Sequence, residues 1–398
     1  MKALIIGGGI AGPVAAMALQ RAGIEPVIFE AHERSADHVG AFLTVAVNGL
    51  QALRAIDLDP RRLPGIATPR FAIYLGDGRK IAELANGPTL PDGTVSLTLK
   101  RADLYAALRD AAVRRGVPIH YGKRLESVSG GVTARFADGS SAEGDLLVGA
   151  DGLKSRVRTL IDPRAPSARF VGLLNCGGYA RGLSLPGPAG LFHMIFGRRC
   201  FFAWIRHPDG ELWWFANPWR RREPAAAELA ATDWRAELDE LFRDDVSPAR
   251  EIIAATRDII GGWASYDFRR VPVWQRDRMI LVGDAAHAAS PSSGQGASMA
   301  IEDAVVLAAC LKRHAHVDEA FGAYERLRRG RVEKIVAQGR RNGSGKAPGP
   351  LGRRLRDLLL PVVFRHLERK GADAMRWIFD YPVDLERLPA ICPGFSKD

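Results

Sequence analysis

A carboxylate, a proline and two glycines follow a short apolar run late in the chain. Residues 279–282 have the length and β-branched character of a buried strand, and Asp284 stands just beyond its end. Pro291, Gly294 and Gly296 come next, and small and apolar residues then recur at helical spacing. A glycine loop that opens a helix presents unpaired backbone N–H groups and a partial positive charge. The stretch therefore predicts a site for an anion or for an electron-rich ligand atom.

The N-terminal residues contain a second glycine loop, with the spacing G-x-G-x-x-G. It lies between a strand-like run, residues 3–6, and a helical run, and its glycines are Gly7, Gly9 and Gly12. In this setting the first glycine permits a tight turn, the second lets a pyrophosphate approach the backbone, and the third lets the helix pack on the strand. Glu30 ends the next predicted strand, where a carboxylate accepts hydrogen bonds from ribose hydroxyls. We expect the ADP half of FAD or NAD here; the alternative is a structural glycine turn with a surface glutamate.

Two further candidates lie in front of predicted helices. Arg101 precedes the helical run 102–108, and its cationic fork suits a pyrophosphate. The alternative is an arginine beside Asp103 on a helix surface. Asp151 follows a strand-like run, residues 146–148, within the sequence Gly-Ala-Asp-Gly. The alternative for Asp151 is a carboxylate that caps a strand-to-helix turn.

These three motifs, in this order, resemble those of the FAD-dependent monooxygenases of the 4-hydroxybenzoate-hydroxylase type. They span residues 7–303, about three quarters of the chain. Ser293 departs from the family pattern, in which many members carry glycine. The residues that the resemblance assigns to the cofactor site are Gly7, Gly9, Ala11, Gly12, Glu30, Arg101, Asp151, Asp284, Pro291, Gly294, Gln295 and Gly296.

The resemblance also implies roles for these residues. Asp284 is expected to bind the ribityl chain, residues 294–296 to face the flavin N1–C2=O edge, and Pro291 to shape the loop beside C4a. Arg101 is expected at the FAD phosphate or ribose, and Asp151 in the cleft for FAD and NAD(P)H. FAD would carry the chemistry: NAD(P)H reduces it, O2 forms a C4a-hydroperoxide, and an aromatic or polycyclic small molecule is oxygenated. No catalytic side chain and no metal is expected.

Other functions share parts of this pattern. A flavin halogenase has the first glycine motif, but its W-x-W-x-I-P segment is absent from this sequence. An NAD-dependent dehydrogenase explains residues 7–30 and leaves residues 283–296 unexplained, and a flavin-dependent oxidase or dehydrogenase or a non-catalytic nucleotide-binding protein also remains. The sequence leaves open the substrate, the oligomeric state, NADH against NADPH, and hydroxylation against epoxidation or Baeyer–Villiger oxidation.

The order of predicted elements indicates an α/β fold. We expect a Rossmann-like FAD-binding domain with an inserted antiparallel-sheet substrate domain and C-terminal helices. The predicted boundaries are 1–70, 96–168 and 270–340 for the discontinuous FAD-binding domain, 71–95 and 169–269 for the substrate domain, and 341–398 for a helical segment. Strand-like runs in the inserted part are rich in aromatic residues and predict an aromatic wall on one face of a sheet.

The net charge of +11 has a local origin. Residues 326–370 contain 14 basic and 3 acidic residues, a difference of +11, so the rest of the chain is balanced. Such an excess attracts nucleic acid, anionic membrane or a phosphorylated cofactor. No nucleic-acid motif accompanies it, so a solvated arginine-rich helix surface is the favoured interpretation and no nucleic-acid partner is expected. Lys346 follows Gly345 in a Gly/Pro-rich stretch from 343 to 350, which predicts a loop and lacks the P-loop spacing.

Cysteine usage and hydropathy predict a cytoplasmic protein. The cysteines have no paired spacing, which argues against a zinc site and a disulfide framework. No apolar run reaches the roughly 18 residues of a membrane span, so no integral membrane segment is expected. The four cysteines are Cys176, Cys200, Cys310 and Cys392.

Overall fold

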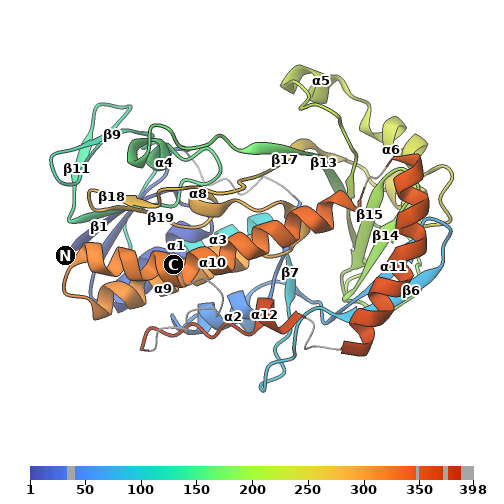
Figure 1. Cartoon of the computed structure of the whole chain (residues 1–398), viewed down its shortest axis with the longest axis horizontal. Coiled ribbons are helices and arrows are strands. Elements are labelled where there is room, and N and C mark those ends of the chain that lie inside the picture. Colours follow the sequence, from blue (N-terminus) through green and yellow to red (C-terminus); the bar gives the residue numbers. More distant parts are fainter. Residues whose placement is uncertain (34–40, 347–348, 371–374, 387–398) are drawn as a thin grey trace.

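The structure is a computed structural model that describes residues 1–33, 41–346, 349–370 and 375–386, and it is built around two main sheets (Figure 1). Cys392 lies outside the described residues, whereas Cys176, Cys200 and Cys310 are free and buried. No helix in the described ranges combines the length and apolarity needed to cross a membrane.

The first sheet carries the N-terminal glycine motif. Its strand order is β18-β19-β12-β1-β2-β8, and each neighbouring pair from β19 to β8 is parallel. Its central strands are buried on both faces, which explains why they read as continuous apolar runs. The strands are β1 (Lys2–Ile6), β2 (Glu25–Phe29), β8 (Ile119–His120), β12 (Leu146–Gly149), β18 (Gln275–Arg276) and β19 (Met279–Leu281).

Helices cover one side of this sheet and a small sheet covers the other (Figure 1). The helices are α1 (Ala11–Arg21), α3 (Arg101–Arg114), α9 (Gly296–Arg313) and α10 (Val317–Ser344). The small sheet consists of β9 (Leu125–Ser129), β10 (Thr133–Phe136) and β11 (Ser141–Glu143), and α4 (Arg156–Ile161) lies beside it. Phe136 stacks on Phe29 at a ring-centre distance of 4.7 Å, which joins the two sheets in one core.

The second main sheet has the order β17-β13-β16-β15-β14-β5-β6. Every neighbouring pair is antiparallel except β14 and β5, which run parallel. The strands are β5 (Arg70–Leu75), β6 (Lys80–Ala85), β13 (Arg169–Ala180), β14 (Leu191–Phe196), β15 (Phe201–Arg206), β16 (Leu212–Asn217) and β17 (Ile260–Asp267). The predicted α/β fold class is confirmed, and the parallel pair is the one departure from the expected antiparallel sheet.

The two faces of this second sheet have different neighbours. Trp214 belongs to a buried cluster with side chains of α6 (Trp234–Phe242) and α7 (Ala249–Ala254), and α5 (Ala226–Ala231) lies beside β17. Because side chains alternate along a strand, Trp213 and Phe215 point to the opposite face. There they pack with Phe42 of β3 (Phe42–Val45).

Short elements connect the two sheets. Strand β7 (Leu97–Lys100) pairs with β3 and with β4 (Ile66–Ala67). Helix α2 (Val47–Arg54) follows β3 and packs against α9, and the 3₁₀ helix η1 (Pro60–Arg62) follows α2. The strand end at β19 continues into α8 (Asp284–His287) and the 3₁₀ helix η2 (Pro291–Ser293).

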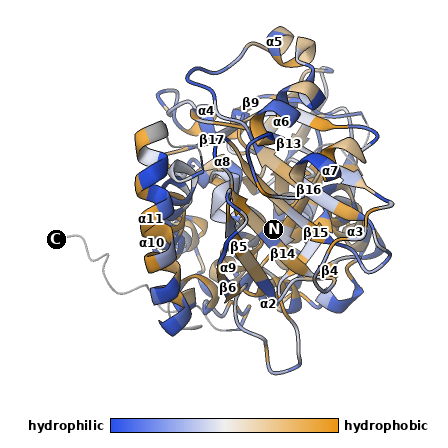
Figure 2. Cartoon of the chain, turned by 90° about the vertical axis from the view of Figure 1, so that its right-hand side faces the viewer, coloured by the Kyte–Doolittle hydropathy of each residue, from blue (hydrophilic) through white to orange (hydrophobic). Residues whose placement is uncertain are grey.

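The C-terminal helices span both halves of the molecule. Helix α10 runs from the first sheet towards β15 (Figure 1), and it continues to Ser344, so the predicted loop starts two residues later than expected. Helix α11 (Pro350–Lys370) packs against β6 and stands at one edge of the molecule (Figure 2). Its outer surface leaves Leu351, Leu358 and Val362 exposed. The short helix α12 (Arg376–Phe379) returns to α2.

Candidate cofactor site

The three glycines of the N-terminal motif have different surroundings. A Cβ on Gly7 would lie 2.4 Å from the Ala150 carbonyl oxygen, and the positive φ of 108° excludes most side chains. A Cβ on Gly12 would lie 1.9 Å from the carbonyl oxygen of Gly7. Gly9 has no neighbouring atom within 4 Å of the same position. Protein packing therefore explains Gly7 and Gly12, and the open space at Gly9 is free for a ligand.

Glu30 stands at the end of β2, where its carboxylate faces the glycine loop. One oxygen accepts a hydrogen bond from the Gly8 N–H at 2.7 Å, and the other accepts from the His32 N–H at 2.9 Å. Each carboxylate oxygen retains a second lone pair, so Glu30 can still accept hydrogen bonds from a ligand. The two backbone contacts fix the direction of the carboxylate.

The Asp151 carboxylate is held by the start of α4. It accepts hydrogen bonds from the Ser155 hydroxyl at 2.5 Å and from the N–H groups of Arg156 and Val157 at 2.7 and 3.1 Å. Desolvation raises the pKa of Asp151, and these hydrogen bonds oppose the rise. The contacts match the alternative of a capped strand-to-helix turn, and direct contact between Asp151 and the cofactor stays a prediction.

Arg101 and Asp284 form an oppositely charged pair of neighbours without direct contact. Arg101 begins α3, and its guanidinium donates to the Tyr105 hydroxyl at 2.6 and 2.8 Å. Desolvation raises the pKa of Asp284, while the charges of His287 and Arg101 lower it. The Asp284 side chain is nevertheless exposed, so water reaches the carboxylate and limits the rise. Both groups are thus close enough to serve one ligand.

The loop before α9 combines open backbone with an anchored side chain. Gly294 adopts a left-handed conformation with φ 62°, and neither Gly294 nor Gly296 has an atom within 4 Å of a Cβ position. The first N–H groups of α9 lack acceptors within the helix. The Gln295 side chain is buried and accepts from Asn48, so it points into the protein. The Gln295 backbone is also engaged within the protein, since its N–H donates to the Ser293 hydroxyl at 3.2 Å and its carbonyl accepts from the Met299 N–H at 2.8 Å.

Backbone contacts bring the separate motifs together. The Gly7 Cβ position lies 3.0 Å from the Asp151 Cα, which joins the first motif to the second. The Gly283 Cβ position lies 3.4 Å from the Ala11 Cβ, which joins the first motif to the third. Pro291 is the exposed first residue of η2, and Gly294 ends that short helix. The predicted residues thus surround one region at the carboxyl ends of β1, β2, β12 and β19, where such sheets bind dinucleotides.

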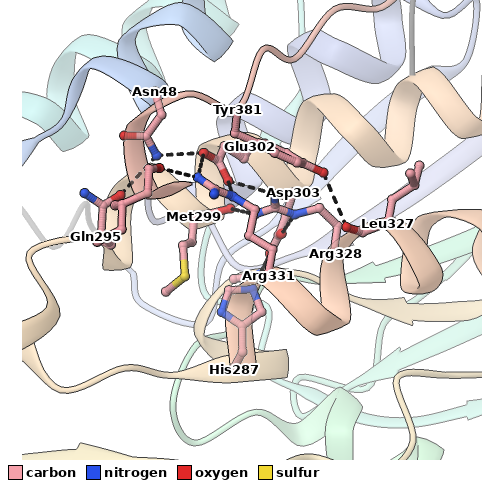
Figure 3. Close-up of polar contacts among 12 residues, drawn as sticks. Asn48, His287, Gln295, Met299, Glu302, Asp303, Leu327, Arg328, Arg331 and Tyr381 are labelled. Atoms are coloured by element: carbon pink, nitrogen blue, oxygen red, sulfur yellow. Dashed lines mark hydrogen bonds and ion pairs between the residues drawn. The ribbon is translucent and has the colours of Figure 1, made fainter. Parts of the chain in front are cut away.

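A buried network of ion pairs and hydrogen bonds lies beside the turn at Gly283 (Figure 3). Asp303 accepts from the Gly283 N–H at 2.8 Å, contacts His287 Nε2 at 2.5 Å and pairs with Arg328 at 2.6 Å. Glu302 pairs with Arg328 at 2.7 Å and with Arg331 at 2.8 Å. Glu302, Asp303 and Arg328 have no exposed surface. The network therefore ties the Gly283 turn to α9 and α10.

The same network reaches the loop through amides. Asn48 donates to Glu302 at 2.6 Å and to the Gln295 side chain at 3.0 Å. Desolvation alone would raise the pKa of Asp303, but the charges of His287 and Arg328 and the hydrogen bonds from His287 and the Gly283 N–H lower it to about 2. Sequence reasoning missed these positioning residues. The available signal was the adjacent acid pair inside the otherwise apolar run of α9.

The basic segment is only partly a solvated surface, so that interpretation is wrong for several of its residues. Arg328 and Arg331 are 0% and 2% exposed because Glu302 and Asp303 provide their counter-charges. Lys346 and Arg356 are each 8% exposed. Part of the charge excess is therefore buried where the C-terminal helices pack against the rest of the molecule.

One surface hollow lies away from these residues. Its volume is about 370 Å³, and it opens on loops at the ends of β13, β15 and β16. None of its lining residues belongs to the predicted cofactor site. The lining residues are Arg181, Gly182, Leu183, Ser184, Arg206, Asp209 and Gly210.

The fold and these contacts define a dinucleotide-binding architecture with a second main sheet. Residues 1–339 match the family described as a FAD binding domain. This match covers more than half of the chain, and the protein belongs to that family.

Curated relatives and solved structures agree with the family. A FAD-dependent urate hydroxylase of Klebsiella pneumoniae is 30% identical over 350 residues, which cover 86% of this chain and 89% of the relative. The 3-amino-4-hydroxybenzoate 2-monooxygenase of Streptomyces platensis is 33% identical over 408 residues, which cover 95% of both chains. A crystal structure of a Klebsiella pneumoniae HpxO variant complexed with FAD superposes with a TM-score of 0.81 at 26% identity, covering 94% of this chain and 97% of that one.

These comparisons confirm the resemblance to FAD-dependent monooxygenases of the 4-hydroxybenzoate-hydroxylase type, and with it FAD as the cofactor. The observed site fits FAD on its own terms. Gly9 leaves open space beside β1, the Glu30 carboxylate is fixed at the end of β2, and the start of α9 is clear of side chains at Gly294 and Gly296.

Proposed function

We propose that this protein uses NAD(P)H and O2 to hydroxylate, or otherwise oxygenate, an aromatic small molecule. The observation that carries the proposal is the convergence of the three motifs at one sheet edge, next to an aromatic face of the second sheet. Bound FAD would supply the redox chemistry: reduction by NAD(P)H, reaction with O2 to a C4a-hydroperoxide, and transfer of one oxygen atom. Protein residues bind and orient the reactants.

Each predicted site residue receives a role from its position. We assign Glu30 to the ribose of the adenosine half, because its carboxylate is fixed beside the glycine loop. Arg101 suits the pyrophosphate, since no carboxylate among the described residues forms an ion pair with it. Asp284 accepts from the ribityl hydroxyls. The positive start of α9 at Gly294 and Gly296 faces the flavin ring, where reduced flavin carries negative charge.

We also propose the division into domains expected from the sequence, in which the second sheet supplies the substrate side. The supporting observation is the aromatic face made by Phe192, Trp213 and Phe215 with Phe42. The Tyr179 hydroxyl donates to the Ala41 carbonyl at 2.9 Å, so this face adjoins the segment that leads into β3.

The relatives narrow the class of substrate. The substrates for which these relatives are named, urate and 3-amino-4-hydroxybenzoate, are planar rings with polar substituents. A second HpxO structure holds FAD together with uric acid. We therefore propose a small aromatic or heteroaromatic substrate that lies against the aromatic face.

Replacing Asp284 tests the cofactor assignment. In Asp284→Ala the ribityl hydroxyls lose a charged acceptor, which is worth about 1.5–3 kcal/mol, so FAD binding should weaken by roughly tenfold or more. Flavin absorbance per mole of purified protein measures the occupancy, with FAD added back to both proteins. The matched control is Asp258→Ala, because the Asp258 side chain is 89% exposed. Equal flavin content in both variants would rule out the ribityl role of Asp284.

A further inference from the structure

Lys346 is a buried lysine on the aromatic face of the second sheet. It lies two residues beyond the end of α10 and is 8% exposed. Its Nζ donates to the Asn217 side-chain oxygen at 2.7 Å and lies 4.1 Å from the centre of the Phe201 ring and 5.4 Å from that of Phe215. An ammonium over aromatic faces is attracted by their π-electrons. These contacts hold the amine in place without neutralising it.

The amine lacks a counter-charge. Within the described ranges, no carboxylate forms an ion pair with Lys346, and Asn217 is its only hydrogen-bond acceptor. Burial of an unpaired ammonium is costly, and desolvation lowers the pKa of Lys346 to about 7. Two of its three N–H donors remain available. An anion beside Nζ would satisfy both the charge and the donors.

The single acceptor is itself fixed. The Asn217 amide nitrogen donates to the Leu174 carbonyl at 3.2 Å and to the Asn175 side-chain oxygen at 2.9 Å. Asn175 in turn donates to the Ser265 hydroxyl at 2.7 Å. Because the amide nitrogen is committed to β13, the oxygen must point at Lys346. These buried hydrogen bonds link β16, β13 and β17, and they fix the amide oxygen that Lys346 contacts.

Lys346 also lies close to the loop assigned to the flavin. The Asn342 side chain, at the end of α10, donates to the Ser292 carbonyl of η2 at 3.1 Å. A Cβ on Gly343 would lie 3.5 Å from the Ser292 hydroxyl. Only two residues separate Gly343 from Lys346. The amine therefore lies where the aromatic face and the η2 loop meet.

We propose that Lys346 binds the carboxylate of an aromatic acid, which makes an aromatic carboxylate the substrate class of this protein. The inference rests on the proposed function and adds the charge of the substrate to it. The two free donors match the two carboxylate oxygens, and the charge-assisted contact forms beside ring faces that accept an aromatic body. Asn217 is then a positioning residue that keeps the amine aligned.

Matched acids and amides test the charge of the ligand. The probes are 3-amino-4-hydroxybenzoate and 6-hydroxynicotinate, each compared with its neutral carboxamide, and calorimetry on the FAD-loaded protein measures Kd. At least one acid should bind about tenfold or more tightly than its amide, as expected for a buried charged hydrogen bond. In Lys346→Met this preference should fall to near unity. If the wild type shows no preference, or binds no probe, the inference is overturned.

Lys334→Met is the matched control for the loss of a lysine. Lys334 lies on α10 and also sits over an aromatic ring, 4.2 Å from the centre of Trp377, but it is exposed. This variant should keep the full preference for the acid. If Lys346→Met fails to fold, Lys346→Gln provides a neutral donor at the same position. A preference that persists in a folded Lys346 variant overturns the inference.

The outcomes separate this inference from the proposed function. Turnover of the preferred aromatic acid by FAD-loaded Lys346→Met with the wild-type KM and kcat would overturn the inference and leave the monooxygenase proposal standing. Conversely, a Lys346-dependent preference for acids, in a protein that consumes no NAD(P)H with any bound probe, would support the anion site and contradict the proposed function.

Discussion

At the scale of single residues, some acidic side chains near the site are exposed and can bind a ligand, whereas others form all their contacts within the protein. Asp284 is exposed at the start of α8, whereas Asp303 is fully buried and bonded to Gly283, His287 and Arg328. Both carboxylates serve the same turn, and only Asp284 has room for a cofactor. Asp303 acts through the backbone that it holds.

Asp303→Asn should therefore destabilise the fold strongly. The substitution leaves Arg328 with one carboxylate partner fewer in a fully buried site, and broken buried pairs cost about 3–5 kcal/mol. Urea unfolding of the variant and the wild type measures the difference. Asp239→Asn is the control, since Asp239 pairs with Arg250 at the surface and its loss should leave the unfolding midpoint unchanged. Equal midpoints for Asp303→Asn and the wild type would contradict this account.

The same contacts predict an acid-dependent stability. The pKa of Asp303 is lowered to about 2 in the folded protein, below the value of about 3.9 in an unfolded chain. Its ionised form therefore contributes roughly 2 kcal/mol above about pH 4, and this contribution disappears as the pH falls from about 4 towards 2. The stability gap between the wild type and Asp303→Asn should narrow over that range. A gap that stays constant down to about pH 2.5 would refute the assignment.

Residue types revealed much of the site, but not where each side chain points. Gly7, Gly9 and Gly12 were recognisable because their spacing reflects backbone geometry, which the chain encodes locally. The Asp151 carboxylate caps α4 and the Gln295 side chain turns towards Asn48. Those orientations depend on the local backbone and on partners elsewhere in the chain, so the motif alone could not supply them.

At the scale of elements, the glycine loop separates packing from binding. A Cβ on Gly12 would overlap the Gly7 carbonyl oxygen, whereas a Cβ on Gly9 would meet no atom within 4 Å, although both residues belong to the segment between β1 and α1. The hydrophobic periodicity of α1 and β1 predicted the elements. The two glycines differ in how closely other backbone atoms approach the position of a Cβ, which depends on the folded chain and cannot be read from periodicity.

Gly9→Ala and Gly12→Ala should consequently have different effects. A methyl group at Gly9 meets no protein atom, so the unfolding midpoint should not change, while crowding of the cofactor by about 1–3 kcal/mol should weaken FAD binding about five- to 150-fold. Gly12→Ala should lower the unfolding midpoint instead. Gly349→Ala, another open position without positive φ, controls for the added methyl group. Unaltered FAD affinity in Gly9→Ala would contradict the proposed approach of FAD to this loop.

Helix α10 buries two arginines that its basic composition alone predicted to be solvent-exposed. Its arginines suggested a solvated basic face, yet Arg328 and Arg331 are buried against Glu302 and Asp303 of α9. The partners are more than twenty residues away in sequence, so charge counting within one segment could not detect them. The adjacent acids Glu302 and Asp303 in the apolar helix α9 indicate, together with these arginines, that the charges pair inside the protein.

At the scale of the whole molecule, the proposed substrate site depends on how the two sheets are arranged. The parallel sheet was predictable from continuous apolar runs that alternate with helices. The parallel pairing of β5 with β14 was not, because the two strands lie far apart in sequence and their hydrophobic pattern does not encode direction. That pairing places β5 and β6 at the edge of the aromatic sheet. Lys346 contacts Phe215 of the aromatic sheet, and Asn342, four residues earlier in the chain, contacts Ser292 of η2; we place the substrate in this region.

The most direct test of the proposed function is turnover under ¹⁸O2. The FAD-loaded protein is supplied with NADH or NADPH and with the aromatic acid that binds most tightly, and the product is analysed by mass spectrometry. We expect one labelled oxygen atom in the product for each reduced nicotinamide consumed in productive turnover. A product that forms without label, or substrate oxidation that consumes no O2, would contradict the proposed function.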